Sequence, residues 1–293
     1  MIVSTIVKHN EHRLAVSYKG MQIDLVSVLH EYPKEGVPRS IDEMIHGNDE
    51  STSTIYAYLE SINDVTPFQV NEEETSFAPV VSNPEKIVCV GLNYRKHADE
   101  TGSPYPEVPI LFNKFNNTLA GHHQAITIPE VSQEVDYEVE LAIVIGKTAK
   151  NVTEEDALNY VFGYTVANDL SARDLQMKTP QWLLGKTCDG FNPIGPFLVT
   201  ADEIGDPQSL TLETKVNGEL RQHSSTSDMI FSCKEIISYI SRHFTLKPGD
   251  LILTGTPEGV VLGLPKEKRV YLKSGDTVSV SIEKIGTLTN TFI

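Results

Sequence analysis

The sequence predicts an α+β fold, in which a small N-terminal α+β domain at residues 1–80 precedes a β-rich main domain at residues 81–293. Short apolar runs rich in β-branched residues recur along the main domain, and turn-forming pairs such as Asn217-Gly218 separate them. Helical patterns are few and do not alternate regularly with the strands. A doubly wound α/β fold is therefore disfavoured, and a curled, barrel-like sheet fits the pattern better.

The N-terminal domain is expected to contain short strands and two helices. The strands are expected at residues 2–7, 13–18 and 21–26. Ser40-Ile41-Asp42-Glu43 has the capping-box pattern that begins a helix, and residues 53–62 form a second helical pattern. A stretch punctuated by Pro79 and Pro84 then links the two domains.

The main domain has a longer series of strand signals. Strands are expected at residues 86–90, 109–113, 135–146, 163–168, 196–200, 210–216, 250–254 and 277–283. Only two capping patterns indicate helices in this part of the chain. Thr153-Glu154-Glu155-Asp156 begins one, and Ser232-Cys233-Lys234-Glu235 begins another that reaches about His243.

Composition narrows the class of partner. Lys and Arg number 24 against 40 Asp and Glu, and the resulting net charge of −16 argues against nucleic acid or an anionic membrane as the main partner. No signal-peptide pattern opens the chain, and no run of 18 apolar residues predicts a membrane span. Three widely spaced cysteines without metal-type spacing are typical of a reducing compartment, so we expect a cytoplasmic protein.

An acidic pattern within residues 135–145 is the most informative feature of the main domain. Apolar residues occupy the odd positions, while Asp136, Glu138 and Glu140 occupy the even positions and so share one face of a strand. Asp169 ends another apolar strand and supplies a further carboxylate. Oxygen ligands of this kind favour Mg²⁺, Mn²⁺ or Ca²⁺. The alternative is an edge strand whose acidic side chains are simply solvated.

A histidine and a carboxylate follow the first strand of the main domain. If residues 94–101 form a helical turn, His97 and Glu100 lie on one face at i and i+3. A carboxylate beside an imidazole orients it and raises its basicity, as activation of a water molecule requires. A surface helix with a local ion pair is the alternative interpretation.

Several polar residues in loops or at strand ends are suited to anion recognition. They are Lys114, Arg173, Gln176 and Lys186. Cations at such positions suit a substrate carboxylate or a developing enolate. Thr256 lies in a glycine-containing loop whose hydroxyl and amide groups could also donate to an anion. Ordinary surface charge is the alternative for each residue taken alone.

Five short motifs stand in order between about Lys86 and Phe292. They are Val90-Gly91-Leu92-Asn93-Tyr94 with His97 and Glu100, Asp136-Tyr137-Glu138-Val139-Glu140-Leu141, Asn168-Asp169-Leu170-Ser171-Ala172-Arg173-Asp174, Gly185-Lys186 before Asp189-Gly190-Phe191, and Gly255-Thr256-Pro257. In this order and spacing they resemble the fumarylacetoacetate hydrolase family. The part before residue 80 looks like the variable N-terminal domain of its two-domain bacterial members.

The resemblance implies a mixed β-roll main domain, usually in a homodimer. It also implies that Glu138, Glu140 and Asp169 bind Mg²⁺ or Mn²⁺. His97 and Glu100 would belong to a mobile lid and form the dyad that activates water. The substrate pocket would be lined by Lys114, Arg173, Gln176, Lys186 and Thr256.

Substrates of the family are small anionic 2-oxo acids. The resemblance therefore implies a divalent-metal-dependent enzyme that cleaves a C–C bond through a metal-bound enolate, by acylpyruvate hydrolysis, oxaloacetate decarboxylation or both. His97 with Glu100 would deprotonate water in the hydrolysis, and Lys186 would lie near the developing oxyanion. Phe115, Glu258 and Val261 depart from the usual family pattern and leave the substrate open.

Two alternatives to this function remain. One is an isomerase or decarboxylase of aromatic-acid catabolism, of the 2-hydroxyhepta-2,4-diene-1,7-dioate type. The other is a catalytically silent metal-binding scaffold protein. The intact pair His97 and Glu100, together with Lys186, argues against a silent scaffold, because a scaffold has no need of them.

Overall fold

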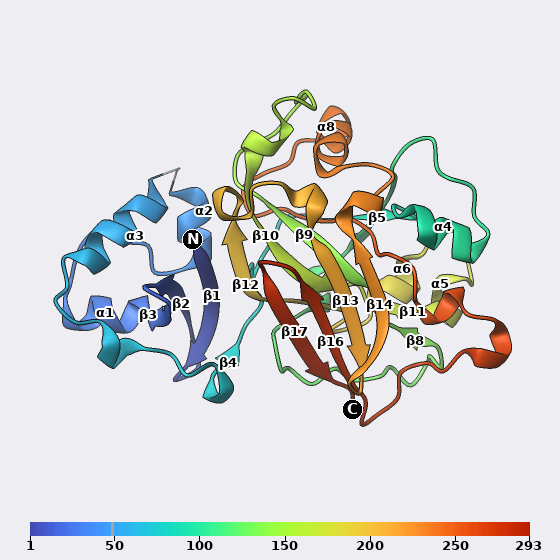
Figure 1. Cartoon of the computed structure of the whole chain (residues 1–293), viewed down its shortest axis with the longest axis horizontal. Coiled ribbons are helices and arrows are strands. Elements are labelled where there is room, and N and C mark those ends of the chain that lie inside the picture. Colours follow the sequence, from blue (N-terminus) through green and yellow to red (C-terminus); the bar gives the residue numbers. More distant parts are fainter. Residues whose placement is uncertain (48–49) are drawn as a thin grey trace.

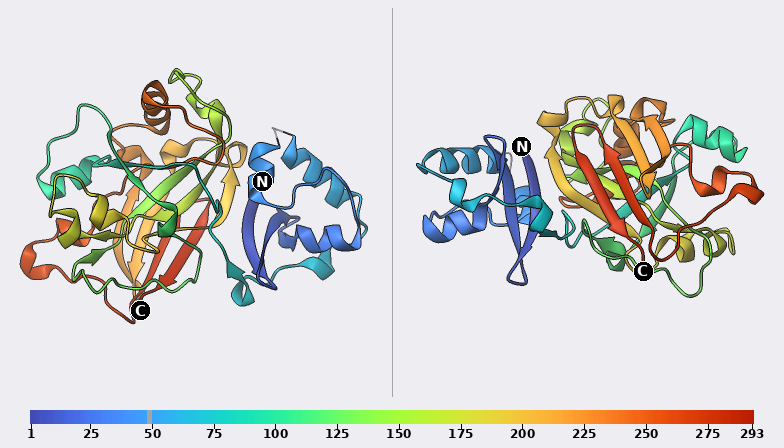
Figure 2. Two further views of the ribbon diagram at one scale, coloured as in Figure 1. Left: turned by 180° about the vertical axis from the view of Figure 1, so that it is seen from behind. Right: turned by 60° about the horizontal axis from the view of Figure 1, so that its bottom comes forward.

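The computed structural model describes residues 1–47 and 50–293. Its three N-terminal strands and three N-terminal helices, here called the N-terminal unit, lie at one side of a larger sheet-dominated body (Figures 1 and 2). The helices are α1 (Leu25–Glu31), α2 (Ile41–His46), α3 (Ser51–Glu60), α4 (Arg95–Thr101), α5 (Arg173–Gln176), α6 (Leu183–Lys186), α7 (Ala201–Ile204) and α8 (Cys233–His243). The predicted α+β, β-rich fold class is confirmed.

An 11-stranded sheet runs through the whole molecule in the order β3-β2-β1-β12-β10-β9-β15-β5-β6, with β4 paired to β1 and β7 paired to β12. Its strands are β1 (Ile2–Lys8), β2 (Glu11–Tyr18), β3 (Met21–Asp24), β4 (Ser76–Phe77), β5 (Ile87–Gly91), β6 (Ile110–Lys114), β7 (Leu119–Ala120), β9 (Val139–Ile145), β10 (Val161–Asn168), β12 (Asn192–Thr200) and β15 (Leu251–Leu253). Because β1 pairs with β12, the N-terminal unit shares this sheet with the main body. The domain boundary at residue 80 stays a prediction.

The N-terminal unit follows the sequence pattern with one exception. The Ser40 hydroxyl accepts a hydrogen bond from the Glu43 amide at 3.1 Å and begins α2, as predicted. The third strand, expected to reach residue 26, ends instead at Asp24. The Asp24 carboxylate accepts a hydrogen bond from the Ser27 amide at 3.0 Å and so begins α1, a helix that the sequence pattern did not indicate.

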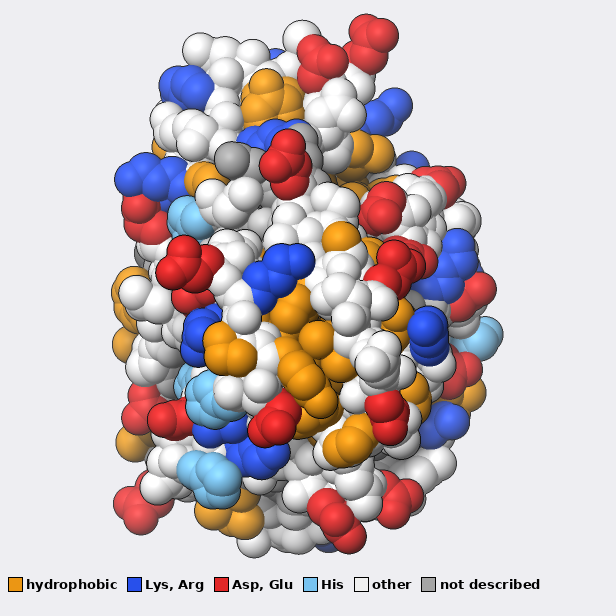
Figure 3. Space-filling view, turned by 90° about the vertical axis from the view of Figure 1, so that its left-hand side faces the viewer, with side chains coloured by type: hydrophobic (Ala, Val, Ile, Leu, Met, Phe, Trp, Pro, Cys, Tyr) orange, Lys and Arg blue, Asp and Glu red, His pale blue; other side chains and the backbone are white. Residues whose placement is uncertain are grey.

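On the face in Figure 3, acidic and basic side chains surround an apolar area.

The predicted acidic strand at residues 135–146 is interrupted. β8 (Val135–Asp136) pairs with β11 (Ser171–Ala172), whereas β9 begins only at Val139 and lies between β10 and β15. Every residue of β9 is buried, so a solvated edge strand is excluded here. The interruption arises because the Glu138 amide donates to the side chain of Asn168 at 3.0 Å rather than to a neighbouring strand.

A second sheet covers one face of the first. Its order is β14-β13-β16-β17, and it packs against β9 and β10. The strands are β13 (Thr211–Val216), β14 (Glu219–Ser225), β16 (Thr277–Ile282) and β17 (Gly286–Thr291). Side chains such as Leu141, Val166, Leu212 and Val280 fill the space between the two sheets. This double layer places the acidic segment deep in the molecule.

The helices of the main body match the sequence patterns only in part. The Ser232 capping box is present and begins α8, as predicted. At Thr153 no α-helix begins; its hydroxyl accepts from the Asp156 amide, and a single 3₁₀ turn at Ala157–Tyr160 follows. Among the described residues, none of the helices combines the length and the apolarity that a membrane span needs.

Candidate active site

A cavity of about 420 Å³ opens beside the interruption between β8 and β9. Its walls come from the end of β5, from α4, α5 and α6, and from the segment after β15. The lining residues are Val90, Gly91, Leu92, His97, Glu100, Thr101, Ser103, Phe112, Glu138, Glu140, Arg173, Gln176, Met177, Trp182, Lys186, Thr256, Leu262, Gly263 and Arg269. This volume suits a small organic ligand.

Three carboxylates meet at the base of this cavity. One ligand oxygen from each of Glu138, Glu140 and Asp169 lies within 4.8 Å of the others, and all three residues are buried. The β9–β10 pairing sets this geometry, because the strand that pairs with β9 delivers Asp169 immediately after its last residue. The Asp169 amide donates to the Glu138 carbonyl at 2.9 Å and holds the two segments together.

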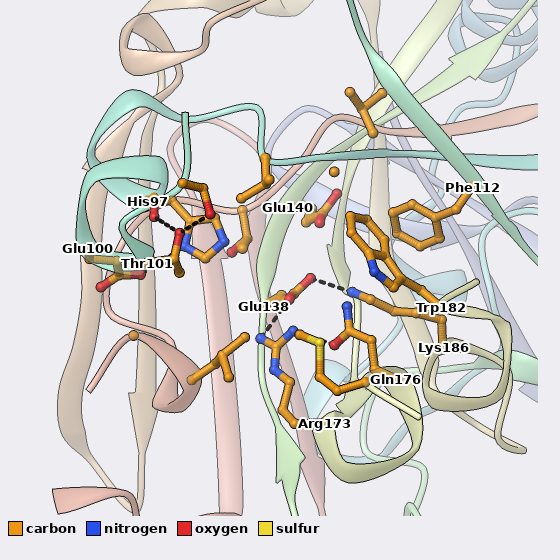
Figure 4. A pocket seen from close by; sticks show the side chains of 18 of the residues that line it. His97, Glu100, Thr101, Phe112, Glu138, Glu140, Arg173, Gln176, Trp182 and Lys186 are labelled. Carbon is orange, nitrogen blue, oxygen red and sulfur yellow. Dashed lines mark hydrogen bonds and ion pairs between the residues drawn. The ribbon is translucent and has the colours of Figure 1, made fainter. Parts of the chain in front are cut away.

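Two cations neutralise Glu138. Lys186 Nζ lies 2.7 Å from Glu138 Oε2, and Arg173 Nη2 lies 2.7 Å from Glu138 Oε1 (Figure 4). Burial opposes ionisation of this carboxyl group, but the two cations outweigh burial and lower the pKa of Glu138 to about 2. Glu138 is therefore a fixed negative charge.

Glu140 has no such compensation. Its Oε2 accepts a hydrogen bond from the Gly255 amide at 2.7 Å, but no Lys or Arg of residues 1–47 and 50–293 forms an ion pair with it. Burial, Asp169 and Glu138 together raise the pKa of Glu140 well above its usual range. A positive charge at this position is missing from the protein itself.

The charges around the base of the cavity support a divalent cation. Four buried carboxylates, Asp136, Glu138, Glu140 and Asp169, face three buried cations, Lys114, Arg173 and Lys186. With all four carboxyl groups ionised, one negative charge exceeds the cations, and Glu140 is the member of the four without an ion pair. An all-oxygen set of ligands suits Mg²⁺ or Mn²⁺. With a divalent cation bound, these four carboxylates and three cations together would carry a net positive charge, which suits an anionic ligand.

The predicted histidine–carboxylate pair forms on α4. His97 Nδ1 lies 2.8 Å from Glu100 Oε1, and the other oxygen of Glu100 accepts from the Gly259 amide at 3.0 Å. Figure 4 shows His97 and Lys186 on opposite sides of Glu138. Because Glu100 fixes one ring nitrogen, the other is left for chemistry in the cavity.

The remaining predicted site residues divide into two groups. Arg173, Gln176, Lys186 and Thr256 all line the cavity. Lys114 does not; its buried ammonium contacts Asp169 and the Leu170 carbonyl, behind the carboxylates. This arrangement gives Lys114 a charge-balancing position in place of the predicted contact with substrate.

The hydroxyl of Thr256 is also engaged inside the protein. It donates to the Val139 carbonyl at 2.9 Å and accepts from Gln222 Nε2 at 3.0 Å. The expectation that this hydroxyl donates to an anion is therefore corrected, because its one proton is already used. Its contribution to the cavity is to fix the glycine-containing loop onto β9.

Sequence patterns missed several cavity residues, among them Phe112, Trp182 and Arg269. Trp182 and Phe112 meet edge to face with ring centroids 5.4 Å apart, and a Cβ atom at Gly91 would lie 2.4 Å from the Trp182 ring. Arg269 reaches the cavity from the segment that follows β15. A lone aromatic residue and an arginine in a basic loop carry no periodic signal, so only the folded chain reveals them.

Residues 86–293 match the family model described as fumarylacetoacetate hydrolase C-terminal. The chain belongs to the fumarylacetoacetate hydrolase family. The match covers all the carboxylates and cations described above, and it makes the chain an enzyme of this family. Relatives of the chain are named as hydrolases, isomerases and tautomerases, so membership alone leaves the particular reaction open.

Three relatives indicate the range of activities within the fumarylacetoacetate hydrolase family. Oxaloacetate tautomerase fahd2, mitochondrial, from Xenopus laevis is 45% identical over 256 residues, which cover 87% of this chain and 78% of that protein. The fumarylacetoacetate hydrolase of Exiguobacterium antarcticum has a TM-score of 0.81 and 34% identity, covering 100% of this chain and 99% of that chain. Maleylpyruvate hydrolase from Sphingobium sp. SYK-6, in complex with manganese(II) and pyruvate, has a TM-score of 0.79 and 28% identity with the same coverage.

Proposed function

We propose that this protein is a Mg²⁺- or Mn²⁺-dependent enzyme that converts a small anionic 2-oxo acid into its enolate, with oxaloacetate as the first candidate substrate. One observation carries the proposal: His97, oriented by Glu100, lines the same cavity as Glu138 and Glu140. A proton-transfer group and a candidate metal site thus face one small space. Proton removal next to a carbonyl needs both.

The metal would be held by Glu138, Glu140 and Asp169. When bound, it would supply Lewis-acid stabilisation of negative charge on the 2-oxo oxygen. Arg173 and Lys186 keep Glu138 ionised and therefore ready to act as a ligand. The relative with bound manganese supports this choice of cation.

His97 is the proposed acid and base. It would take a proton from the carbon next to the 2-oxo group, while Glu100 holds the ring in place. In tautomerisation the proton returns at the 2-oxo oxygen, so no atom is lost or gained. Gln176 is positioned to assist, because its side-chain oxygen accepts from Arg173 at 2.9 Å and its amide nitrogen is left for substrate.

The same enolate also explains the reactions expected from the sequence. Hydrolysis of an acylpyruvate would use His97 to deprotonate a water molecule, with Lys186 near the oxyanion. Decarboxylation of oxaloacetate breaks its C3–C4 bond and leaves the electron pair on the pyruvate enolate. We rank oxaloacetate tautomerisation first because the frog relative is named for that reaction at 45% identity. C–C bond cleavage is second, supported by the maleylpyruvate hydrolase.

Three assays on one preparation decide among these reactions. Enol–keto conversion of oxaloacetate, pyruvate release from oxaloacetate and pyruvate release from acetylpyruvate are measured with Mg²⁺, with Mn²⁺ and after chelation. Metal-dependent conversion of oxaloacetate is expected. Turnover that survives chelation, or no turnover of any of these 2-oxo acids, would overturn the proposal and revive the isomerase and scaffold alternatives.

We further propose a homodimer that uses the edge of the large sheet at β6. This strand ends the sheet on the side opposite β3, and Val108, Ile110 and Phe115 on or beside it are exposed. Apolar residues on an open strand edge are suited to pairing with another copy. Light scattering should give twice the monomer mass, and Val108→Lys should lower it. The cytoplasmic location stays a prediction; the frog relative is by name mitochondrial.

A further inference from the structure

The positive charges that line the cavity are not equally available to a substrate. Arg173 pairs with Asp136 and Glu138, and Lys186 pairs with Glu138 and Asp169. Arg269 also lines the cavity, but no carboxylate of residues 1–47 and 50–293 forms an ion pair with it. It is the cavity arginine whose charge the protein leaves uncompensated.

Backbone carbonyls hold Arg269 in place. Its Nε donates to the Leu264 carbonyl at 2.8 Å, and its Nη2 donates to the Leu262 carbonyl at 2.6 Å. These neutral acceptors fix the planar guanidinium without cancelling its charge. A guanidinium that is already positioned loses little freedom when it binds a carboxylate, and it suits two-point contacts.

The loop that carries Arg269 is itself attached to the site. The Asp136 carboxylate accepts from the amides of Val261 and Leu262, both at 3.0 Å. Gly263 packs so closely on Glu100 that an added Cβ would lie 2.4 Å from its carboxyl carbon. Arg269 therefore belongs to the same wall of the cavity as the His97–Glu100 pair.

We propose that Arg269 binds the distal carboxylate of a four-carbon 2-oxo dicarboxylic acid and so selects such substrates over those with an uncharged end. The inference rests on the proposed function, in which the 2-oxo acid end lies at the carboxylate triad. A cavity of about 420 Å³ accommodates a molecule of this size. Among the cavity cations, Arg173 and Lys186 are already paired with Asp136, Glu138 and Asp169, so the second carboxylate is left to Arg269.

This contact also affects which reaction follows. Loss of CO₂ from oxaloacetate turns its distal carboxylate into a neutral molecule, and a bound guanidinium stabilises that carboxylate before it leaves. Proton transfer between carbon and the 2-oxo oxygen leaves the carboxylate intact. Arg269 therefore favours tautomerisation over decarboxylation of the bound dicarboxylate.

Binding of two unreactive ligands tests the proposal without relying on turnover. Malate and 2-hydroxybutanoate share one end and differ in carrying a carboxylate or a methyl group at the other. In the Mn²⁺-loaded protein, titration calorimetry should give malate an affinity about 10- to 100-fold higher, the range expected for a charge-assisted contact. Arg269→Met should remove this preference and leave 2-hydroxybutanoate binding unchanged. Arg269→Lys should retain part of it.

Lys268→Met is the matched control, because Lys268 is exposed and does not line the cavity. It should leave both affinities unchanged. The proposal is overturned if the wild-type protein shows no preference for malate, or if Arg269→Met keeps that preference. It is also overturned if Arg269→Met weakens the binding of both ligands equally, as a purely structural role predicts. Turnover of oxaloacetate and of acetylpyruvate by the same wild-type sample is recorded separately. If neither oxaloacetate nor acetylpyruvate is turned over, the proposed function is overturned, whereas the ligand preference still decides the role of Arg269.

Discussion

Glu138 and Glu140 line one cavity two residues apart, yet their surroundings move their pKa values in opposite directions. Lys186 and Arg173 bind both oxygens of Glu138. Among residues 1–47 and 50–293, the Gly255 amide is the hydrogen-bond donor to Glu140, which lies beside two further carboxylates. The protein thus supplies one ionised ligand with its own counter-charges and leaves the other to an external cation.

This difference predicts opposite effects of two similar substitutions on the metal-free protein. Glu138→Gln should lower the free energy of unfolding by about 1.5–3 kcal/mol, because it removes the carboxylate that Arg173 and Lys186 share and leaves Asp136 and Asp169 as their buried partners. Glu140→Gln should raise it, because it removes a buried carboxylate that has no cation. Urea unfolding in the presence of a chelator measures both.

Metal titration completes this comparison. Both variants should bind Mn²⁺ at least about 10-fold more weakly, as loss of one ligand requires. Glu283→Gln on the exposed surface serves as the control and should change neither property. Equal destabilisation of the metal-free protein by both site variants would contradict the assignment of the unpaired charge to Glu140.

A second prediction concerns the proton-transfer pair. His97→Gln should reduce kcat for oxaloacetate by at least about 100-fold, because general acid–base catalysis contributes at that level. Glu100→Gln should give a smaller loss, since Glu100 orients His97 and does not itself transfer the proton. Mn²⁺ affinity should be unchanged in both. His223→Gln is the control, because His223 also contacts a glutamate but lies on an exposed strand. Full activity of His97→Gln would refute the assignment.

The periodic parts of the fold could be predicted from the sequence, and the parts set by side chains could not. Apolar runs predict β5, β6, β9, β10, β12, β13, β15 and β16, but β14 and β17 of the second sheet were not expected. The interruption at Tyr137–Glu138 depends on Asn168, which is distant in sequence and takes the amide that a strand partner would use. The helix after Asp24 was missed because apolar residues continue across the boundary, and only the Asp24 carboxylate marks it.

The residues of the candidate site also include some that could be predicted from the sequence and some that could not. Glu138, Glu140 and Asp169 could be selected from sequence because each stands within or directly after a segment with an apolar strand pattern. For Lys114, the residue type suggested a substrate contact, but burial against Asp169 gives it another position. Arg269 could not be selected, because its place in the cavity results from hydrogen bonds to two loop carbonyls.

A third prediction uses the close approach of Gly263 to Glu100. Alanine at this position would place its Cβ 2.4 Å from the Glu100 carboxyl carbon, and that flexible side chain can move away. Gly263→Ala should therefore fold and bind Mn²⁺ normally but lose about 10-fold or more in kcat, because His97 loses its orienting partner. Gly20→Ala, at a surface turn with no neighbour near its Cβ, tests whether any glycine substitution has this effect. Retained kcat in Gly263→Ala would show that Glu100 need not hold this position.

The last prediction concerns the dependence of stability on pH. Burial, and to a smaller extent His123, lowers the pKa of His122 from 6.5 to about 4. His122 Nδ1 accepts a hydrogen bond from the Thr289 amide at 3.0 Å, which requires the neutral ring. Because the pKa is depressed in the folded state, the unfolded chain binds this proton first as pH falls. Stability from His122 is therefore complete above about pH 6.5 and is lost towards pH 4.

Urea unfolding between pH 7 and pH 4.5 measures this loss. His122→Asn keeps an acceptor for the Thr289 amide but cannot titrate, so the wild-type protein should lose about 1 kcal/mol more than the variant over this range. The expected difference in stability is small because His122 is partly exposed to solvent. His9→Asn changes an exposed turn residue and should follow the wild-type protein. Parallel pH profiles for the wild-type protein and His122→Asn would mean that the imidazole titrates alike in the folded and unfolded chains.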